Sequence, residues 1–127
     1  MGIIANSENE IKLYYSSETS LGKQTYAYVS ASEKKMSGID ISKTKVTGSQ
    51  WAEIATGLNI SVGDLINTEH PDFINAYGEE KIDLDEHDWL RVLEKHPETL
   101  AYPVMISGNI FRVLKTPSDF VKYIEPD

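Results

Sequence analysis

The feature that most constrains the fold is a strand–helix–strand order near the N-terminus. Residues 11–15 alternate their aliphatic side chains and are rich in strand-forming residue types. Residues 23–35 contain no proline or glycine and predict a helix, and residues 39–41 alternate again as a short second strand. Two strands joined through a helix are parallel, with a right-handed crossover. The chain therefore begins with a β-α-β unit.

Cap residues mark the helices that follow. Thr47 and Gln50 have the spacing of a capping box, in which each side chain accepts a hydrogen bond from the other residue's amide. Ser61 and Asp64 repeat that spacing, and Asp85 can cap a later helix that Pro97 ends. We expect helices near 21–34, 48–58, 61–67, 85–95 and 117–124, and one or two further turns over 72–77.

The C-terminal part adds antiparallel strands. Residues 107–109 separate two apolar runs, which predicts a β-hairpin. We therefore expect an α/β fold whose four-stranded mixed sheet has helices on both faces and a helical insertion between strands 2 and 3. The strands are predicted near 11–15, 38–42, 103–107 and 110–114, in one domain over 11–127 after an N-terminal extension over 1–10.

Charge and cysteine content exclude several functions. The 127 residues carry a formal net charge of −8, which repels nucleic-acid backbones, so we expect no nucleic-acid binding. Cysteine is absent, so the chain supplies no disulfide, no cysteine-ligated zinc and no thiolate nucleophile. We find no secretory signal and no apolar run approaching a membrane span, and expect a cytoplasmic protein without a membrane partner.

Four segments in this order resemble the arsenate reductase (ArsC) and Spx family of thioredoxin-like proteins. They are the strand, loop and helix start over 14–23, the helical segment over 58–67, the late helix over 89–97, and Leu100-Ala101-Tyr102-Pro103-Val104. The resemblance covers roughly 11–124 and implies a thioredoxin-like fold. It also implies a cis peptide bond between Tyr102 and Pro103.

The chain departs from this family at the reactive positions. The resemblance places the family's catalytic cysteine at Thr19 and the second cysteine of its redox switches at Gly22, whereas the basic residue beyond is kept as Lys23. The arginines that hold an oxyanion in the reductases correspond to Asn67, Tyr102 and Lys115. A threonine hydroxyl cannot form the thiol adduct or a disulfide. The substitutions therefore argue against the family's chemistry, and no residue is assigned as catalytic.

The loop over 16–23 has two interpretations. Its hydroxyls, its helix-start amides and Lys23 suit an anion or a peptide, but Thr19 or Ser20 can equally serve as an ordinary helix cap. We take the second interpretation as the more frequent one. The residues of a possible anion or thiol site are Ser17, Thr19, Ser20, Lys23, Tyr102, Pro103 and Lys115.

Two further features receive structural interpretations. Six acids over 79–88 resemble a calcium loop only in part, and the histidines have no metal-ligand spacing, so we expect no metal site. His70, His87 and His96 are expected in surface or capping roles. Trp51 and Trp89 begin apolar helix faces, and we expect both to be largely buried.

Three functions remain open. The first is a redox-inactive member of the family that binds a protein partner or a small anion and needs no cofactor. The second is an oxidoreductase that takes its thiol from glutathione, held near Thr19, Ser17 or Tyr15. The third is a scaffold protein without a ligand site.

Overall fold

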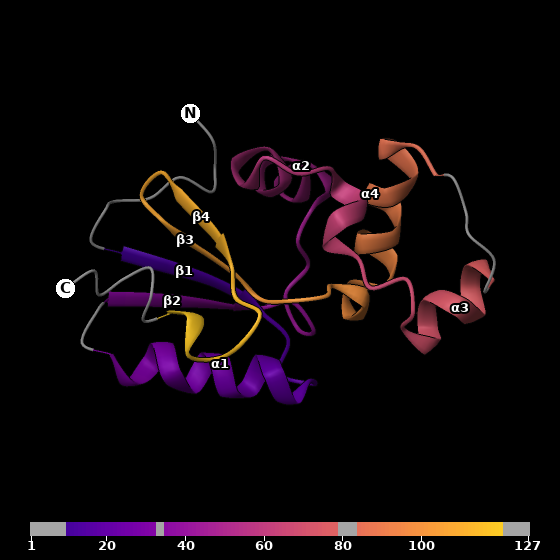
Figure 1. Cartoon of the computed structure of the whole chain (residues 1–127). Helices are drawn as coiled ribbons and strands as arrows, with labels where there is room; N and C mark the ends of the chain where they lie inside the picture. The colour runs from indigo at the N-terminus through magenta and orange to yellow at the C-terminus, as the bar shows by residue number, and fades with distance from the viewer. Residues whose placement is uncertain (1–9, 33–34, 79–83, 121–127) are drawn as a thin grey trace.

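A four-stranded mixed sheet lies at one end of the computed structural model (Figure 1). The structure describes residues 10–32, 35–78 and 84–120. The strands are β1 (Glu10–Tyr15), β2 (Lys35–Asp40), β3 (Val104–Ser107) and β4 (Ile110–Val113), in the order β2-β1-β3-β4. β1 is parallel to β2 and antiparallel to β3, which pairs antiparallel with β4. The predicted mixed sheet is confirmed.

The bounds of the second strand differ from the prediction. β2 starts at Lys35 and ends at Asp40, whereas the sequence placed it near 38–42. The sequence misplaced this strand because the prediction relied on alternating apolar and polar residues. β2 includes Gly38 and has exposed or half-buried residues throughout, so it lacks the alternation typical of a strand with one buried face. Its register with β1, with Gly38 opposite Leu13, defines the strand instead.

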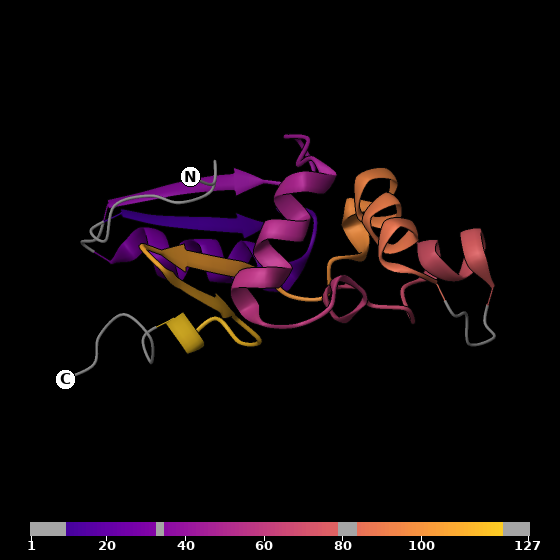
Figure 2. The ribbon, with the colours of Figure 1, turned by 90° about the horizontal axis from the view of Figure 1, so that it is seen from above.

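Two helices cover opposite faces of the sheet (Figures 1 and 2). α1 (Ser20–Ala31) follows β1 on one face, and it ends before the predicted residue 34. α2 (Gly48–Leu58) lies on the other face and begins with the predicted capping box between Thr47 and Gln50. It ends at Asn59, whose left-handed backbone (φ 61°) closes the helix.

The helical insertion between β2 and β3 forms the other end of the molecule (Figure 2). After α2 it contains η1 (Val62–Leu65), α3 (Pro71–Tyr77), α4 (Glu86–Lys95) and η2 (Pro97–Thr99). The predicted cap Asp85 accepts a hydrogen bond from the Asp88 amide at 2.8 Å. The last predicted helix, 117–124, falls largely on residues outside the described ranges.

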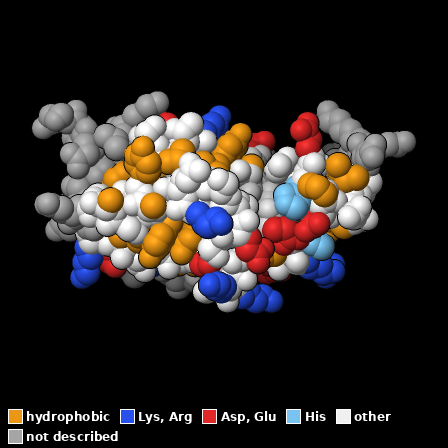
Figure 3. Space-filling view, turned by 90° about the horizontal axis from the view of Figure 1, so that it is seen from below, with side chains coloured by type: hydrophobic (Ala, Val, Ile, Leu, Met, Phe, Trp, Pro, Cys, Tyr) orange, Lys and Arg blue, Asp and Glu red, His pale blue; other side chains and the backbone are white. Residues whose placement is uncertain are grey.

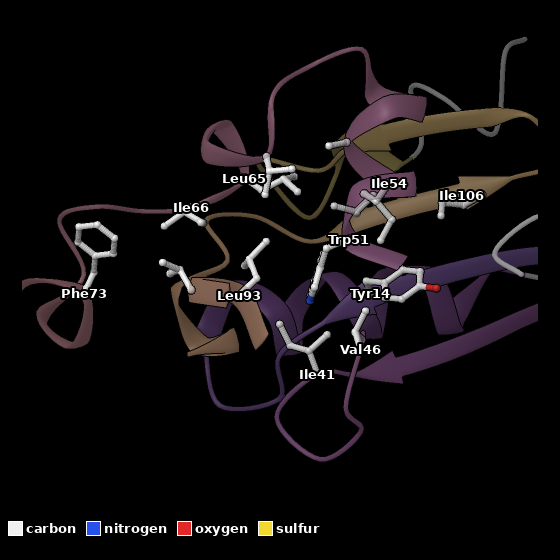
Figure 4. Close-up of a cluster of buried hydrophobic side chains, with 14 residues drawn as sticks. Tyr14, Ile41, Val46, Trp51, Ile54, Leu65, Ile66, Phe73, Leu93 and Ile106 are labelled. Carbon is white, nitrogen blue, oxygen red and sulfur yellow. The ribbon is translucent and has the colours of Figure 1, made fainter. Parts of the chain in front are cut away.

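Two apolar clusters pack the sheet from its two faces. The one under α1 contains buried residues of β1 and β3, with Val29 and Phe120. The larger one joins Tyr14 and Trp51 to the helical insertion (Figure 4). Trp51 is fully buried as predicted, and Trp89 is less completely covered but packs against the same cluster. Trp89 stacks on Phe73 of the short α3, with ring centroids 5.9 Å apart, near the outer end of the insertion.

The parallel strands bring two loops together. β1 and β2 end at the same edge of the sheet, where the loop before α1 and the loop before α2 begin. Ligand sites in sheets with parallel strands commonly lie at this edge. Across residues 10–32, 35–78 and 84–120, no helix has the length and hydrophobicity needed to cross a membrane.

Candidate functional site

Thr19 lies at the start of α1, where it caps the helix. Its backbone is extended, and its Oγ1 accepts a hydrogen bond from the Gly22 amide at 2.9 Å. The same hydroxyl donates to the Ser16 carbonyl oxygen at 3.2 Å. The side chain therefore satisfies one of the helix's free amides, as the structural interpretation of this loop predicted. Its single hydroxyl hydrogen is also in use.

Gly22 is required by a close approach of the backbone. A Cβ atom at this position would overlap the Ser16 carbonyl oxygen and would lie 2.8 Å from Thr19 Oγ1. The carbonyl is part of the main chain, so relief needs movement of the loop or of the helix. Any side chain at position 22, cysteine included, therefore disturbs the cap.

The loop is joined to β2 through Asp40. Its Oδ1 accepts hydrogen bonds from the Ser17 amide (3.1 Å), the Ser42 amide (3.1 Å) and the Ser42 hydroxyl (2.7 Å). Partial burial raises the pKa of Asp40, but the hydrogen bonds from Ser17 and Ser42 outweigh it and lower the pKa to about 2. Asp40 is therefore an ionised acceptor that fixes the loop.

A small hollow lies between the loop and the segment before β3. Its volume is about 70 Å³. We call it the Thr19 hollow; its lining is Ser16, Thr19, Leu21, Ile41, Leu100, Ala101, Tyr102 and Pro103. Tyr102 is 39% exposed and Pro103 is buried.

The peptide bond between Tyr102 and Pro103 is trans, so the cis bond implied by the resemblance is wrong for this chain. The Pro103 carbonyl accepts a hydrogen bond from the Leu114 amide at 2.9 Å and so continues the β3–β4 ladder.

The three positions that the resemblance assigns to the reductases' arginines, Asn67, Tyr102 and Lys115, carry other side chains. The Asn67 side chain accepts a hydrogen bond from the Glu69 amide at 3.0 Å and serves as a turn residue. The Lys115 ammonium lies 5.8 Å from the centre of the Tyr102 ring, a cation–π arrangement. One ammonium at the rim lacks the planar, two-pronged donor geometry of a guanidinium.

The predicted site residues divide into two groups. Thr19, Tyr102 and Pro103 line the Thr19 hollow together, and Lys115 joins them through its contact with Tyr102. Ser17, Ser20 and Lys23 do not line it. Ser17 turns towards the segment that follows β2, where its hydroxyl lies 3.3 Å from the Ser42 hydroxyl. Ser20 Oγ accepts from the Gln24 side chain at 3.1 Å, and Lys23 is exposed one turn into α1.

The arrangement suits binding better than thiol chemistry. A hydroxyl that stabilises a bound thiolate must donate its hydrogen to the sulfur, and the Thr19 hydrogen is donated to the Ser16 carbonyl. Tyr15 stacks on Tyr26 with centroids 4.8 Å apart, and burial, with nearby Asp40 and Tyr26, raises its pKa. These residues therefore do not fit a glutathione thiolate as they stand. Within the described residues, no three histidine or acidic side chains gather as metal ligands.

Asp40 was not identified from the sequence, and Ser16 lay within the predicted loop over 16–23 but was not named among the candidate site residues. Ser16 is buried; its carbonyl is the acceptor for Thr19, and its hydroxyl accepts from the Glu18 amide at 3.2 Å. Asp40 anchors the loop from the neighbouring strand. A signal for Asp40 was present, because parallel strands end at one edge and place this acid beside the loop that follows β1. For Ser16, the loop position was predicted, but the roles of its carbonyl and hydroxyl as acceptors were not.

No family model matches the sequence, and no curated protein does. Solved structures do match, at low identity. "Putative arsenate reductase from Yersinia pestis" has a TM-score of 0.76 and 15% identity, covering 88% of this chain and 98% of that one. "Arsenate reductase from Vibrio cholerae" has a TM-score of 0.77 and 13% identity, covering 92% and 98%. A putative ArsC-family-related protein from Bacteroides fragilis has a TM-score of 0.72 and 12% identity, covering 88% and 95%. The chain therefore has the thioredoxin-like fold of ArsC-type structures and contains no cysteine.

Proposed function

We propose that this protein is redox-inactive and acts by binding, with the Thr19 hollow taking an anionic oxygen group. One observation carries the proposal most directly. At the position that the resemblance gives to the nucleophile, the side chain is a helix cap whose hydroxyl is hydrogen-bonded at both its acceptor and its donor sides. The contact of Gly22 with the Ser16 carbonyl adds to it, because the second cysteine position cannot carry a side chain without movement of the loop.

The start of α1 supports the anionic character of the ligand. The amides of Ser20 and Leu21 have no hydrogen-bond partner in the described part of the chain, and Leu21 lines the hollow. Free amides and the helix dipole at the start of a 12-residue helix favour a negative group. The Lys115 ammonium over Tyr102 adds a positive charge at the rim. The small volume limits the ligand to a single anionic group.

Two sources of that group remain in the proposal: a small inorganic anion, or a carboxylate side chain of a protein partner. NMR titration of ¹⁵N-labelled protein with sulfate, with arsenate and with acetate tests both. We expect shifts at the Ser20 and Leu21 amides, weakened by Lys115→Gln and unchanged by Lys35→Gln at the start of β2. Absence of shifts at these amides with all three anions contradicts the binding proposal.

The glutathione-dependent alternative is tested by a further NMR titration of the same labelled protein, with glutathione and with S-methylglutathione. It requires the Thr19 hydroxyl to leave the Ser16 carbonyl and donate to sulfur. Shifts at Thr19 and Tyr102 with glutathione but not with S-methylglutathione support a bound thiolate and so this alternative.

The net charge of −8 favours a basic protein partner as the source of any protein–protein contact. We continue to expect a cytoplasmic location.

A further inference from the structure

The polar groups around the Thr19 hollow include a donor beyond the amides of Ser20 and Leu21. Ser16 lines the hollow and is only 8% exposed. Its hydroxyl accepts a hydrogen bond from the Glu18 amide at 3.2 Å, and the hydroxyl hydrogen has no acceptor in the described part of the chain. Two free amides and one free hydroxyl hydrogen therefore surround the hollow, so a bound group must supply acceptors.

The charges around the hollow favour a ligand with a single negative charge. Lys115 supplies one ammonium at the rim, near the Tyr102 ring. Asp40, which accepts from the Ser17 amide of the same loop, is ionised, and Glu18 adds an exposed acid to that loop. On the face seen in Figure 3, the largest group of acidic side chains lies towards the helical insertion, which the hollow adjoins through the segment after η2. A doubly charged oxyanion such as sulfate therefore meets stronger repulsion than a monoanion does.

The wall of the hollow offers an apolar contact. Apart from the two hydroxyl residues, every lining residue is apolar or aromatic. Four of these residues are half-buried or exposed and so keep surface that a ligand can cover: Leu21, Leu100, Ala101 and Tyr102. An inorganic anion gains nothing from such a wall, whereas an aliphatic group loses contact with water there. Leu21 supplies both a free amide and an apolar side chain, so the two kinds of contact lie on one residue.

We propose that the ligand of the Thr19 hollow is a singly charged carboxylate on a short aliphatic body, and that the hollow discriminates against doubly charged oxyanions. The carboxylate oxygens accept from the amides at the start of α1 and from the Ser16 hydroxyl. The aliphatic body lies against Leu21 and Tyr102. This inference rests on the function proposed above, the binding of an anionic oxygen group, and names the class of that anion.

Isovalerate is the probe that tests the carboxylate and its aliphatic body together. In NMR titrations of the ¹⁵N-labelled full chain at constant ionic strength, we expect shifts at the Ser20 and Leu21 amides with isovalerate and with acetate. Isovalerate should bind at least about threefold more tightly than acetate, because its further carbons cover the apolar wall. Sulfate should bind at least about threefold more weakly than acetate. Sulfate binding as tightly as isovalerate, or equal binding of the two acids, overturns this inference and leaves the proposed function standing.

Two further probes test the charge and the source of the carboxylate. Isovaleramide has the same body without the charge and should bind at least about tenfold more weakly than isovalerate. Equal binding of the amide, or no shifts with any anion, overturns both this inference and the proposed function. N-acetylglutamic acid α-amide carries the carboxylate on a side chain of a polypeptide unit. Binding as tight as that of isovalerate supports a partner's carboxylate side chain, and weaker binding supports a free aliphatic acid.

Two variants separate the hydroxyl donor from the apolar wall. Leu21 belongs to neither apolar cluster, so Leu21→Ala spares the core. It should weaken isovalerate more than acetate, so that the threefold preference falls towards one. Ser16→Ala should weaken both acids by a similar factor, about threefold or more, and Ser30→Ala, at an exposed position of α1, is the matched control that changes neither. If Leu21→Ala leaves the preference intact, or Ser16→Ala leaves both affinities intact, the inference is wrong.

Discussion

Replacing Gly22 by alanine puts a methyl group against the Ser16 carbonyl oxygen. Overpacking of this kind typically costs about 1–3 kcal/mol. Movement of the carbonyl also weakens its two hydrogen bonds from Thr19, each worth about 1 kcal/mol. Alanine's better helix propensity returns about 1 kcal/mol. We therefore expect Gly22→Ala to lower the free energy of unfolding by about 2 kcal/mol.

Urea unfolding followed by circular dichroism measures this change, with the slope of the transition confirming that the unfolded states are comparable. Ala27→Gly, at an exposed position of the same helix, is the matched control for helix propensity alone and should cost about 1 kcal/mol. If Gly22→Ala instead stabilises the protein by about the amount that the control loses, propensity dominates. The close approach to Ser16 then does not constrain position 22, and our argument against a second cysteine there fails.

Three further predictions concern the core and the loop. Trp51→Ala should cost about 3–5 kcal/mol in urea unfolding and Trp89→Ala about 2 kcal/mol, because only Trp51 is fully buried; equal costs would contradict the packing. The low pKa of Asp40, about 2, contributes stability above about pH 4 that is lost as the pH falls towards 2. After allowance for solvent screening we expect about 1 kcal/mol, so Asp40→Asn should remove about that much acid sensitivity between pH 5 and 2, and an unchanged pH profile would refute it. Thr19→Cys should give a thiol with a pKa below the free value of about 8.5, measured by the pH dependence of alkylation; a pKa at or above that value would mean that position 19 does not benefit from the helix start.

The helices were predictable where their caps were visible. Thr47 with Gln50 and Asp85 marked the starts of α2 and α4, and both caps are present. These signals are local, because a cap and its amides lie within three residues of each other. The edge strand β2 was misplaced because its identity depends on pairing with β1 rather than on its own alternation.

The candidate site was only partly predictable. The sequence placed Thr19 at a helix start, and the resemblance brought Tyr102 and Pro103 near it, which the lining of the hollow confirms. The trans peptide bond before Pro103 and the contact of Gly22 with Ser16 depend on the tertiary structure, so the spacing of residues in the sequence does not predict them. Trp89, which is less completely covered than Trp51, shows the same limit, since an apolar helix face predicts contact but not how completely neighbours cover it.

The central claim is that the protein binds without redox chemistry. Its most direct test is an arsenate reduction assay with the purified, cysteine-free wild-type chain, supplied with NADPH and, in turn, with glutathione, glutaredoxin and glutathione reductase and with thioredoxin and its reductase. We predict no consumption of NADPH and no arsenite above the protein-free background in either system. Arsenate-dependent turnover that Thr19→Val abolishes would contradict this account, because it would show that the Thr19 hydroxyl supports thiol chemistry in spite of its hydrogen bonds to Ser16 and Gly22.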